Sequence, residues 1–204
     1  MPRIAVIDFE TTGPSPALGD RATEVAIVMV EGGRVVGRYQ SLMNAGVRIS
    51  PFIESFTGIS NAMVAAAPPA AKVMAAASAF VGDAPMVAHN ASFDRRYWQA
   101  ELARAGLAAP QPFACTVLLS RRLYPEVRSH SLGAMAAHHR LPSAGRAHRA
   151  LADAEVAAAL LAHIQADLCA RFDLPEAHHP LLMKLQASPK HALAGTVRKF
   201  LATA

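Results

Sequence analysis

The first part of the chain consists of short apolar runs separated by turn sequences, which is the pattern of β-strands. Residues 3–9 form an apolar run that reads as a strand buried on both faces. The β-rich runs 24–30 and 34–43 are separated by a Glu-Gly-Gly sequence, which predicts a hairpin. The pattern therefore predicts three strands at the start of the chain.

Helical patterns dominate after residue 60. We expect a short helix capped by Ser60, helices over 70–81 and 92–105, one that ends near Tyr124, one from Ser131 through His138, and one over 149–168. Two short apolar runs, 84–88 and 112–116, predict a fourth and a fifth strand among them. This order of elements predicts an α/β domain with a five-stranded mixed sheet flanked by helices.

The composition changes beyond Phe172, where Asp173-Leu174-Pro175 and His178-His179-Pro180 interrupt the pattern. We therefore predict a main domain over 1–170 and a C-terminal helical extension over 171–204. Residues 190–201 could form an amphipathic basic helix. The first interpretation of the extension is that it packs on the core; the alternative is that it contacts nucleic acid or a partner protein.

Composition excludes several classes of protein. The chain has 204 residues, enough to bury a core without disulfides, and its 52% hydrophobic content includes much alanine. No run of about 18 apolar residues exists, so we expect no membrane partner. Cys115 and Cys169 make neither a disulfide framework nor a zinc site. With no signal-peptide pattern at the first residues, a reduced, cytoplasmic location is predicted.

The net charge of +5 fits an anionic partner such as nucleic acid, although many soluble proteins are mildly basic. The aromatic content of 6% argues against a wide platform for base stacking.

The first candidate metal ligands lie at the end of the first predicted strand. Asp8 and Glu10 are two residues apart, so their side chains leave the strand on the same face. Two like charges this close are unfavourable unless a cation lies between them, and Mg²⁺ takes oxygen ligands of this kind. The alternative is a solvated strand end with two ordinary acids.

A third acid, Asp94, falls in the first turn of the predicted helix 92–105. An acid is favoured there by the helix dipole alone, which is a sufficient structural reason for it. Asn90 and Ser92 are alternative cap residues, so Asp94 is free to reach a metal.

His148 and Asp153 form a His-x-x-x-x-Asp element at the start of the long helix. An imidazole has an ordinary pKa near 6.5 and can accept a proton from a water beside a metal, and the acid can complete a metal site from a rigid helix. Other histidines of the chain, namely His138, His139, His178 and His179, are interpreted as surface residues. The spacing to an acid separates His148 from them.

In this order the motifs resemble those of the DEDDh (DnaQ-like) exonucleases, which include the proofreading subunit of bacterial DNA polymerase III and ribonuclease T. The matching segments are 8–13 (Asp-Phe-Glu-Thr-Thr-Gly), 57–60 with Met63-Val64, 87–94, 128–132 and 148–154. The resemblance covers roughly residues 3–168. Thr57 stands where many relatives have His, and Cys115 where many have Asp.

The resemblance implies a ribonuclease-H-like fold and two Mg²⁺ or Mn²⁺ ions per site. Asp8, Glu10 and Asp153 would hold one ion, Asp8 would bridge to the second with support from Asp94, and His148 would deprotonate the attacking water. The substrate contacts implied for the 3′ end are Thr11, Thr12, Ile59, Asn90 and Phe93. For Ile59 and Phe93, ordinary core residues are the alternative.

These features predict a 3′→5′ exonuclease that acts on single-stranded 3′ ends, with DNA favoured, and releases nucleoside 5′-monophosphates, in proofreading or repair. One alternative is an exoribonuclease similar to ribonuclease T. Another is a non-catalytic nucleic-acid-binding or polymerase-associated subunit. The tail contains no convincing clamp-binding peptide, which argues against attachment to a replicative polymerase.

Overall fold

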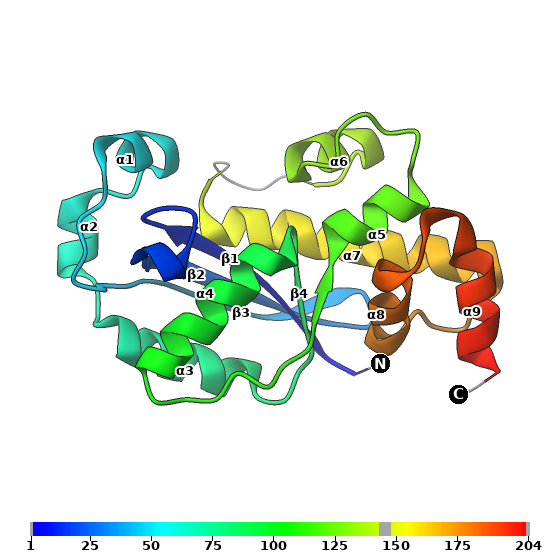
Figure 1. Cartoon of the computed structure of the whole chain (residues 1–204), viewed down its shortest axis with the longest axis horizontal. Coiled ribbons are helices and arrows are strands. Elements are labelled where there is room, and N and C mark those ends of the chain that lie inside the picture. The colour runs from blue at the N-terminus through cyan, green and yellow to red at the C-terminus, as the bar shows by residue number, and fades with distance from the viewer. Residues whose placement is uncertain (1, 143–147, 203–204) are drawn as a thin grey trace.

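The computed structural model describes residues 2–142 and 148–202 as a layered α/β structure (Figure 1). The strands are β1 (Ile4–Thr11), β2 (Ala22–Glu31), β3 (Arg34–Leu42), β4 (Met86–Ala88) and β5 (Phe113–Cys115). The helices are α1 (Pro51–Thr57), α2 (Asn61–Ala66), α3 (Ala70–Val81), α4 (Ala91–Arg104), α5 (Thr116–Leu123), α6 (Leu132–His139), α7 (Ala150–Phe172), α8 (His179–Ala187) and α9 (Leu193–Leu201). Short 3-10 turns lie at Pro16–Leu18 and Lys190–Ala192.

The five strands form one mixed sheet in the order β3-β2-β1-β4-β5. β1 is antiparallel to β2, and β2 to β3, whereas β1, β4 and β5 run parallel to one another. β1 therefore separates an antiparallel half of the sheet from a parallel half. The carboxyl ends of β1, β4 and β5 meet at one edge, which is where ligands bind in sheets of this kind.

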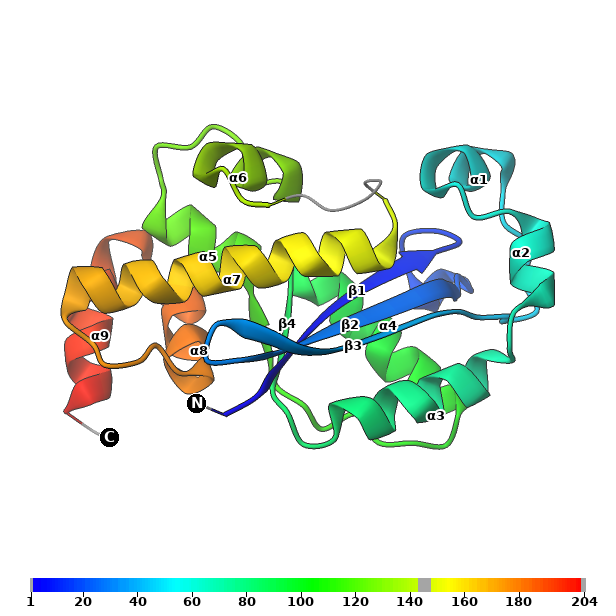
Figure 2. The ribbon, with the colours of Figure 1, turned by 180° about the vertical axis from the view of Figure 1, so that it is seen from behind.

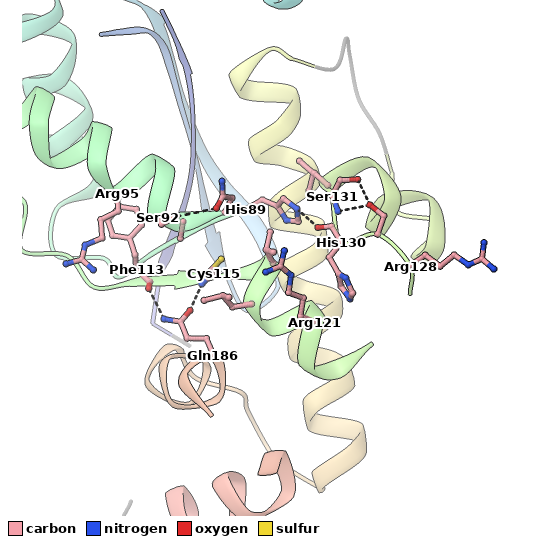
Figure 3. A pocket seen from close by; sticks show the side chains of 16 residues that line it. His89, Ser92, Arg95, Phe113, Cys115, Arg121, Arg128, His130, Ser131 and Gln186 are labelled. Atoms are coloured by element: carbon pink, nitrogen blue, oxygen red, sulfur yellow. Dashed lines mark hydrogen bonds between the residues drawn. The ribbon is translucent and has the colours of Figure 1, made fainter. Parts of the chain in front are cut away.

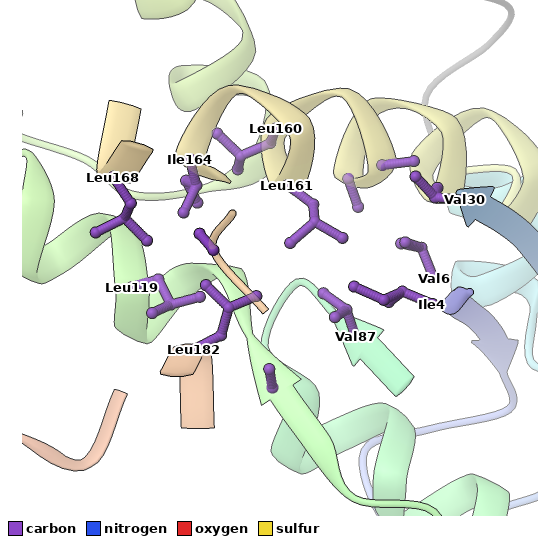
Figure 4. Close-up of a cluster of buried hydrophobic side chains, with 14 of the residues drawn as sticks. Ile4, Val6, Val30, Val87, Leu119, Leu160, Leu161, Ile164, Leu168 and Leu182 are labelled. Atoms are coloured by element: carbon purple, nitrogen blue, oxygen red, sulfur yellow. The ribbon is translucent and has the colours of Figure 1, made fainter. Parts of the chain in front are cut away.

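Alternation along β1 divides the core between the two faces of the sheet. The helix α7 runs along one face of the sheet, and α3 and α4 cover the other (Figure 2). Ile4 and Val6 pack in the core on the α7 side, while Ala5 and Ile7 pack in the core on the α3 and α4 side. Figure 4 shows the α7 side, where side chains of the strands meet those of the helices: Ile4, Val6, Val30, Val87, Leu119, Leu160, Leu161, Ile164, Leu168 and Leu182. Asp8 continues the α7-facing row beyond the end of this core.

The C-terminal helix α8 is part of the core. Leu182 is fully buried in the α7-side cluster. The side chain of Gln186 pairs with the free edge of β5: its Oε1 accepts from the amide N of Cys115 at 2.6 Å, and its Nε2 donates to the carbonyl O of Phe113 at 3.2 Å. The extension thus packs on the core, as the first interpretation predicted. The division at residue 170 stays a prediction.

The pattern predicted most elements correctly. All five strands are present, α3 has the predicted bounds, and Ser60 and Ser131 cap their helices by accepting from Met63 N and Ala134 N. The helix α1 was not predicted, and α8 was predicted only as an unspecified part of the C-terminal helical extension. Both begin at a proline in the first turn, where its missing N–H costs nothing, so these prolines start helices.

None of the helices within the described ranges is both long and apolar enough to cross a membrane.

Candidate active site

Three carboxylates converge at the carboxyl end of β1. Asp8 and Glu10 leave β1 toward α7, and Asp153 reaches them from the first turn of that helix. One oxygen from each of the three lies within 4.8 Å of the others. Glu10 is buried, whereas Asp8 and Asp153 are partly exposed. The i, i+2 spacing on the strand and the approach of α7 together build this acidic cluster of Asp8, Glu10 and Asp153.

Asp94 joins the acidic cluster from the other side of β1. It lies in the first turn of α4, as predicted, and is 2% exposed. Its Oδ1 accepts a hydrogen bond from the amide N of Phe9 at 3.2 Å, which fixes it beside the strand between the two other acids. α4 begins at Ala91, and the side chain of Asn90 before it makes no cap hydrogen bond, contrary to the expectation that it could cap the helix. The carboxylate of Asp94 accepts from its own amide N as well as from that of Phe9, so it both stabilises the helix start and reaches β1.

His148 lies at the entrance to α7 with its side chain exposed. Its backbone N donates to Asp153 Oδ2 at 3.0 Å, and its φ of 60° is in the left-handed region, which histidine tolerates better than most residues. The imidazole ring lies against the ring of Phe56, with 3.9 Å between centroids. The backbone and Phe56 thus place a solvent-accessible imidazole beside the acidic cluster.

A buried ion pair holds the start of α7 against the sheet. Glu24 on β2 is fully buried directly opposite Glu10, and it receives Nε and Nη2 of Arg149 at 3.1 and 2.8 Å. Glu24 also accepts from the amide N of Ala150 at 3.1 Å. Arg149 lies between His148 and Asp153 in the chain. This bidentate ion pair therefore fixes the position of both residues.

A second ion pair of the same kind holds the loop that follows β1. Arg21 donates through Nε and Nη2 to the buried carboxylate of Glu101 at 2.8 and 2.9 Å. Within the loop, the Thr11 hydroxyl donates to Gly13 O at 2.7 Å, and Thr12 Oγ1 accepts from the amide N of Arg21 at 3.0 Å. Both threonine side chains therefore shape the loop, and the substrate contacts implied for them stay predictions.

The other implied substrate contacts differ in their exposure. Asn90 is exposed at the start of α4 and has a φ of 73°. Phe93 is partly buried, with its ring centroid 4.9 Å from that of Tyr97. Ile59 is fully buried in a small core with Val64, so it offers no surface to a base in this conformation. The contact implied for Ile59 stays a prediction, with the core alternative favoured by its burial.

Phe56 and Glu24 were not among the predicted site residues. Phe56 lies on the unpredicted helix α1, where it is 46% exposed and stacks on Phe52 with a 6.1 Å centroid separation. Two exposed phenylalanines four residues apart form a stripe on a helix, and that spacing was the available signal. Glu24 appeared only as one acid in an apolar strand, and its partner Arg149 is distant in sequence.

Burial raises the pKa of Asp8, Glu10, Asp94 and Asp153, whereas the hydrogen bonds from Arg149 and Ala150 lower that of the neighbouring Glu24. Burial, followed by the charges of Asp94 and Glu10, raises the pKa of Asp8 well above its ordinary value. Burial raises the pKa of Glu10 to about 7, with Asp153 and Glu24 adding to the rise and Arg149 opposing it. Burial likewise raises the pKa of Asp94 and of Asp153. The cluster holds protons unless positive charge compensates it, and its hard oxygen donors fit a divalent cation.

We expect the metal-free protein to lose stability as the pH rises from about 6.5 to 8.5. An acid with a raised pKa binds a proton in the folded state that the unfolded chain has already released, so its stabilising contribution is lost as the pH rises through the folded-state value, here about 7 for Glu10. Below pH 6.5 the partly buried His89 acts in the opposite direction, because desolvation lowers its pKa to about 4. In EDTA the melting temperature should fall by on the order of 5 °C over this range.

Calorimetric scans at fixed ionic strength, with and without Mn²⁺, would measure this. The Asp94→Asn variant should show a flatter profile, and Mn²⁺ should stabilise the unaltered protein more at pH 8.5 than at pH 6.5. A melting temperature that is constant or rises with pH in EDTA would contradict the assigned pKa directions.

The sequence of this chain is similar to those of known exonucleases and DNA polymerases. The model of an exonuclease family, RNase_T, matches residues 5–161. The 3′-5′ exonuclease DinG of Bacillus subtilis is 34% identical over 193 residues, which are 94% of this chain and 20% of that protein. A PolC-type DNA polymerase III of Bacillus cereus is 35% identical over 164 residues, 80% of this chain and 11% of that protein. The chain thus spans a fifth or less of the length of these two relatives.

Two solved structures are also similar. Exonuclease X in complex with 5′ overhanging duplex DNA shares 34% identity and a TM-score of 0.65, over 79% of this chain and 90% of that chain. The nuclease domain of 3′hExo, a DEDDh family member bound to rAMP, has a TM-score of 0.70 over 86% of this chain and 96% of that chain. Its identity of 18% supports the fold alone.

Proposed function

The chain belongs to the RNase_T exonuclease family, and we propose that it is a metal-dependent 3′→5′ exonuclease that uses the acidic cluster, Asp94 and His148 as its active site. The observation that carries this proposal is the convergence of Asp8, Glu10 and Asp153, with carboxylate oxygens within 4.8 Å of one another beside an exposed imidazole. Three acids this close repel one another when ionised, and a bound cation would offset that repulsion.

The donor set fits two Mg²⁺ or Mn²⁺ ions. Asp8, Glu10 and Asp153 would hold one ion, and Asp8 would bridge to a second that Asp94 supports. Bound ions of this kind offset the negative charge that develops on the attacked phosphate and on the departing oxygen. The raised pKa values of the acids mean that loading competes with protons, so metal affinity should weaken below neutral pH.

His148 is the proposed general base. Its ring is exposed and fixed by Phe56, so it can take a proton from a water molecule and return it to solvent. The water oxygen forms a bond to the terminal phosphorus while the bond from phosphorus to the upstream 3′-oxygen breaks. The departing oxygen takes up a proton, which leaves a nucleoside 5′-monophosphate and a strand shortened by one residue.

DNA is the proposed substrate, with a role in proofreading or repair. Exonuclease X, a relative at 34% identity, was solved with DNA, and other relatives are DNA polymerases of the PolC type. These proteins share the exonuclease domain with this chain.

Digestion of end-labelled oligonucleotides tests the activity directly. A 5′-labelled single strand of DNA should shorten in steps of one nucleotide with Mg²⁺ or Mn²⁺ and stay intact with EDTA, because the acids need a cation to act. The same strand of RNA should be degraded at least several-fold more slowly. Cleavage that persists in EDTA, or that starts from the 5′ end, would overturn the assignment. Binding of either strand without any metal-dependent cleavage would favour the non-catalytic alternative.

A further inference from the structure

A large pocket opens at the carboxyl ends of β4 and β5, next to the proposed active site. Its volume is about 890 Å³. It lies between the start of α4, the first part of α5 and the loop before α6, and α8 contributes Gln186. Asn90 and Ser92, which line it, belong to the same turn of chain that carries Asp94. The pocket therefore begins where the acidic edge of the sheet ends.

Three arginines from three different segments line this pocket: Arg95 of α4, Arg121 of α5 and Arg128 of the loop before α6. All three side chains are exposed, and none has a hydrogen-bond or ion-pair partner within residues 2–142 and 148–202. No Asp or Glu occurs among the described residues that line the pocket. We call it the arginine pocket. Its charge is uncompensated, in contrast to the paired Arg21 and Arg149.

The three arginines lie in different parts of the lining of the arginine pocket. Arg95 and Arg128 project from opposite sides, and Arg121 lies between them (Figure 3). Apolar side chains of Phe113, Val117 and Leu118 line the pocket as well. Cationic side chains beside an apolar surface suit a nucleic-acid strand, because its phosphates are charged and its sugars and bases are uncharged.

The wall that carries Arg128 is held in place from the sheet. His89, at the end of β4, bridges two segments: its Nδ1 is 2.9 Å from the Thr116 hydroxyl, and its Nε2 is 3.0 Å from the carbonyl O of His130. A carbonyl only accepts, so Nε2 donates this hydrogen bond. His130 is tied in turn to Tyr124 O through its own Nε2 at 3.1 Å. The arginine pocket is thus built on an ordered frame.

We propose that the arginine pocket binds the phosphates of the DNA strand upstream of the cleaved bond, an inference that rests on the proposed function. The 3′-terminal nucleotide would lie over the acidic cluster, and the strand would continue across β4 and β5 past Ser92. Arg95, Arg121 and Arg128 would each pair with a phosphate. The pocket determines how tightly a long strand is held; it takes no part in the chemistry of the terminal phosphate.

Dependence on substrate length tests this. Thymidine 5′-(p-nitrophenyl phosphate) carries the terminal phosphate alone, whereas oligothymidylates of two to ten residues extend into the arginine pocket. For the unaltered protein KM should fall as the strand lengthens. For the triple variant Arg95→Ala, Arg121→Ala, Arg128→Ala, KM for the ten-residue strand should rise roughly 10- to 100-fold with kcat unchanged, and the p-nitrophenyl ester should be hydrolysed normally.

Direct binding separates a failure of this inference from a failure of the proposed function. Fluorescence anisotropy of a labelled ten-residue oligothymidylate in EDTA needs no catalysis. The triple variant should bind more weakly, and its dependence of log K on log salt concentration should be less steep by about 2, since each single-strand phosphate contact contributes roughly 0.7. Substituting all three with Lys should restore most of the binding, because the charge is kept.

Arg34→Ala is the matched control. Arg34 is equally exposed but lies at the hairpin end of β3, away from the carboxyl end of β1, so its removal should leave KM and the salt dependence unchanged. Unchanged binding in the triple variant would overturn the inference. So would an equal loss in the Arg34→Ala control, or an equal loss on the p-nitrophenyl ester. If the unaltered protein binds the strand through these arginines but cleaves nothing, the proposed function fails and the arginine pocket stands.

Discussion

Replacing Asp8 with asparagine is expected to reduce metal-dependent hydrolysis of DNA by at least about 10³-fold. Asp8 is the centre of the site: the charges of Asp94, Glu10 and Asp153 all act on it, and one of its oxygens lies within 4.8 Å of oxygens of Glu10 and Asp153. An amide has the same shape as the carboxylate but binds hard cations poorly. The fold should survive, because the substitution removes repulsion from the metal-free site.

The measurement pairs nucleotide release from an end-labelled strand with calorimetry of Mn²⁺ binding. Asp173→Asn makes the same chemical change at the far end of α7, on an exposed residue whose φ of 52° asparagine tolerates. This control should keep full activity. If Asp8→Asn retained both Mn²⁺ binding and turnover, the metal site would have to lie elsewhere.

The second large effect is expected at His148. His148→Asn should lower kcat by roughly 10²–10⁴-fold while KM and the affinity for Mn²⁺ change little, because only proton transfer is removed. Asparagine is the appropriate substitution, since it accepts the left-handed backbone found there, where alanine would add strain. His148→Gly, assayed with added imidazole, should recover part of the lost rate.

His191→Asn is the control for His148, because it removes another exposed histidine far along the chain, in the turn before α9. The His191→Asn variant should hydrolyse DNA with the kcat of the unaltered protein. Full activity in His148→Asn would remove His148 from the reaction, and loss of Mn²⁺ binding in that variant would show that it acts on the metal site instead.

Local features placed each acid on its element, and the family resemblance implied that the acids act together. The spacing of Asp8 and Glu10 on a strand, and of Asp153 in the first turn of a helix, are local features, and the structure brings all three together. The residues that position them could not be predicted in the same way. Glu24 and Arg149 are 125 residues apart, and nothing near either one indicates the partner. Their pairing is a property of how α7 crosses the sheet.

The unpredicted elements have a similar cause. Pro180 was taken as an interruption and Pro51 was not assigned a role, although proline fits well in the first turn of a helix, where both residues lie. Because α1 was not predicted, Phe56, whose ring contacts that of His148, was not recognised as a site residue. The arginine pocket could not be predicted from the sequence either, because its three arginines come from separate segments that only the fold brings together.

The amide of Gln186 has a practical consequence for work with this domain. By satisfying Cys115 and Phe113, it closes a strand edge that would otherwise be a template for intermolecular pairing. Shortening the polypeptide after α7 would uncover that edge together with the leucines that α8 buries, and would invite aggregation. Any truncated form meant for expression should therefore extend at least through Ala187.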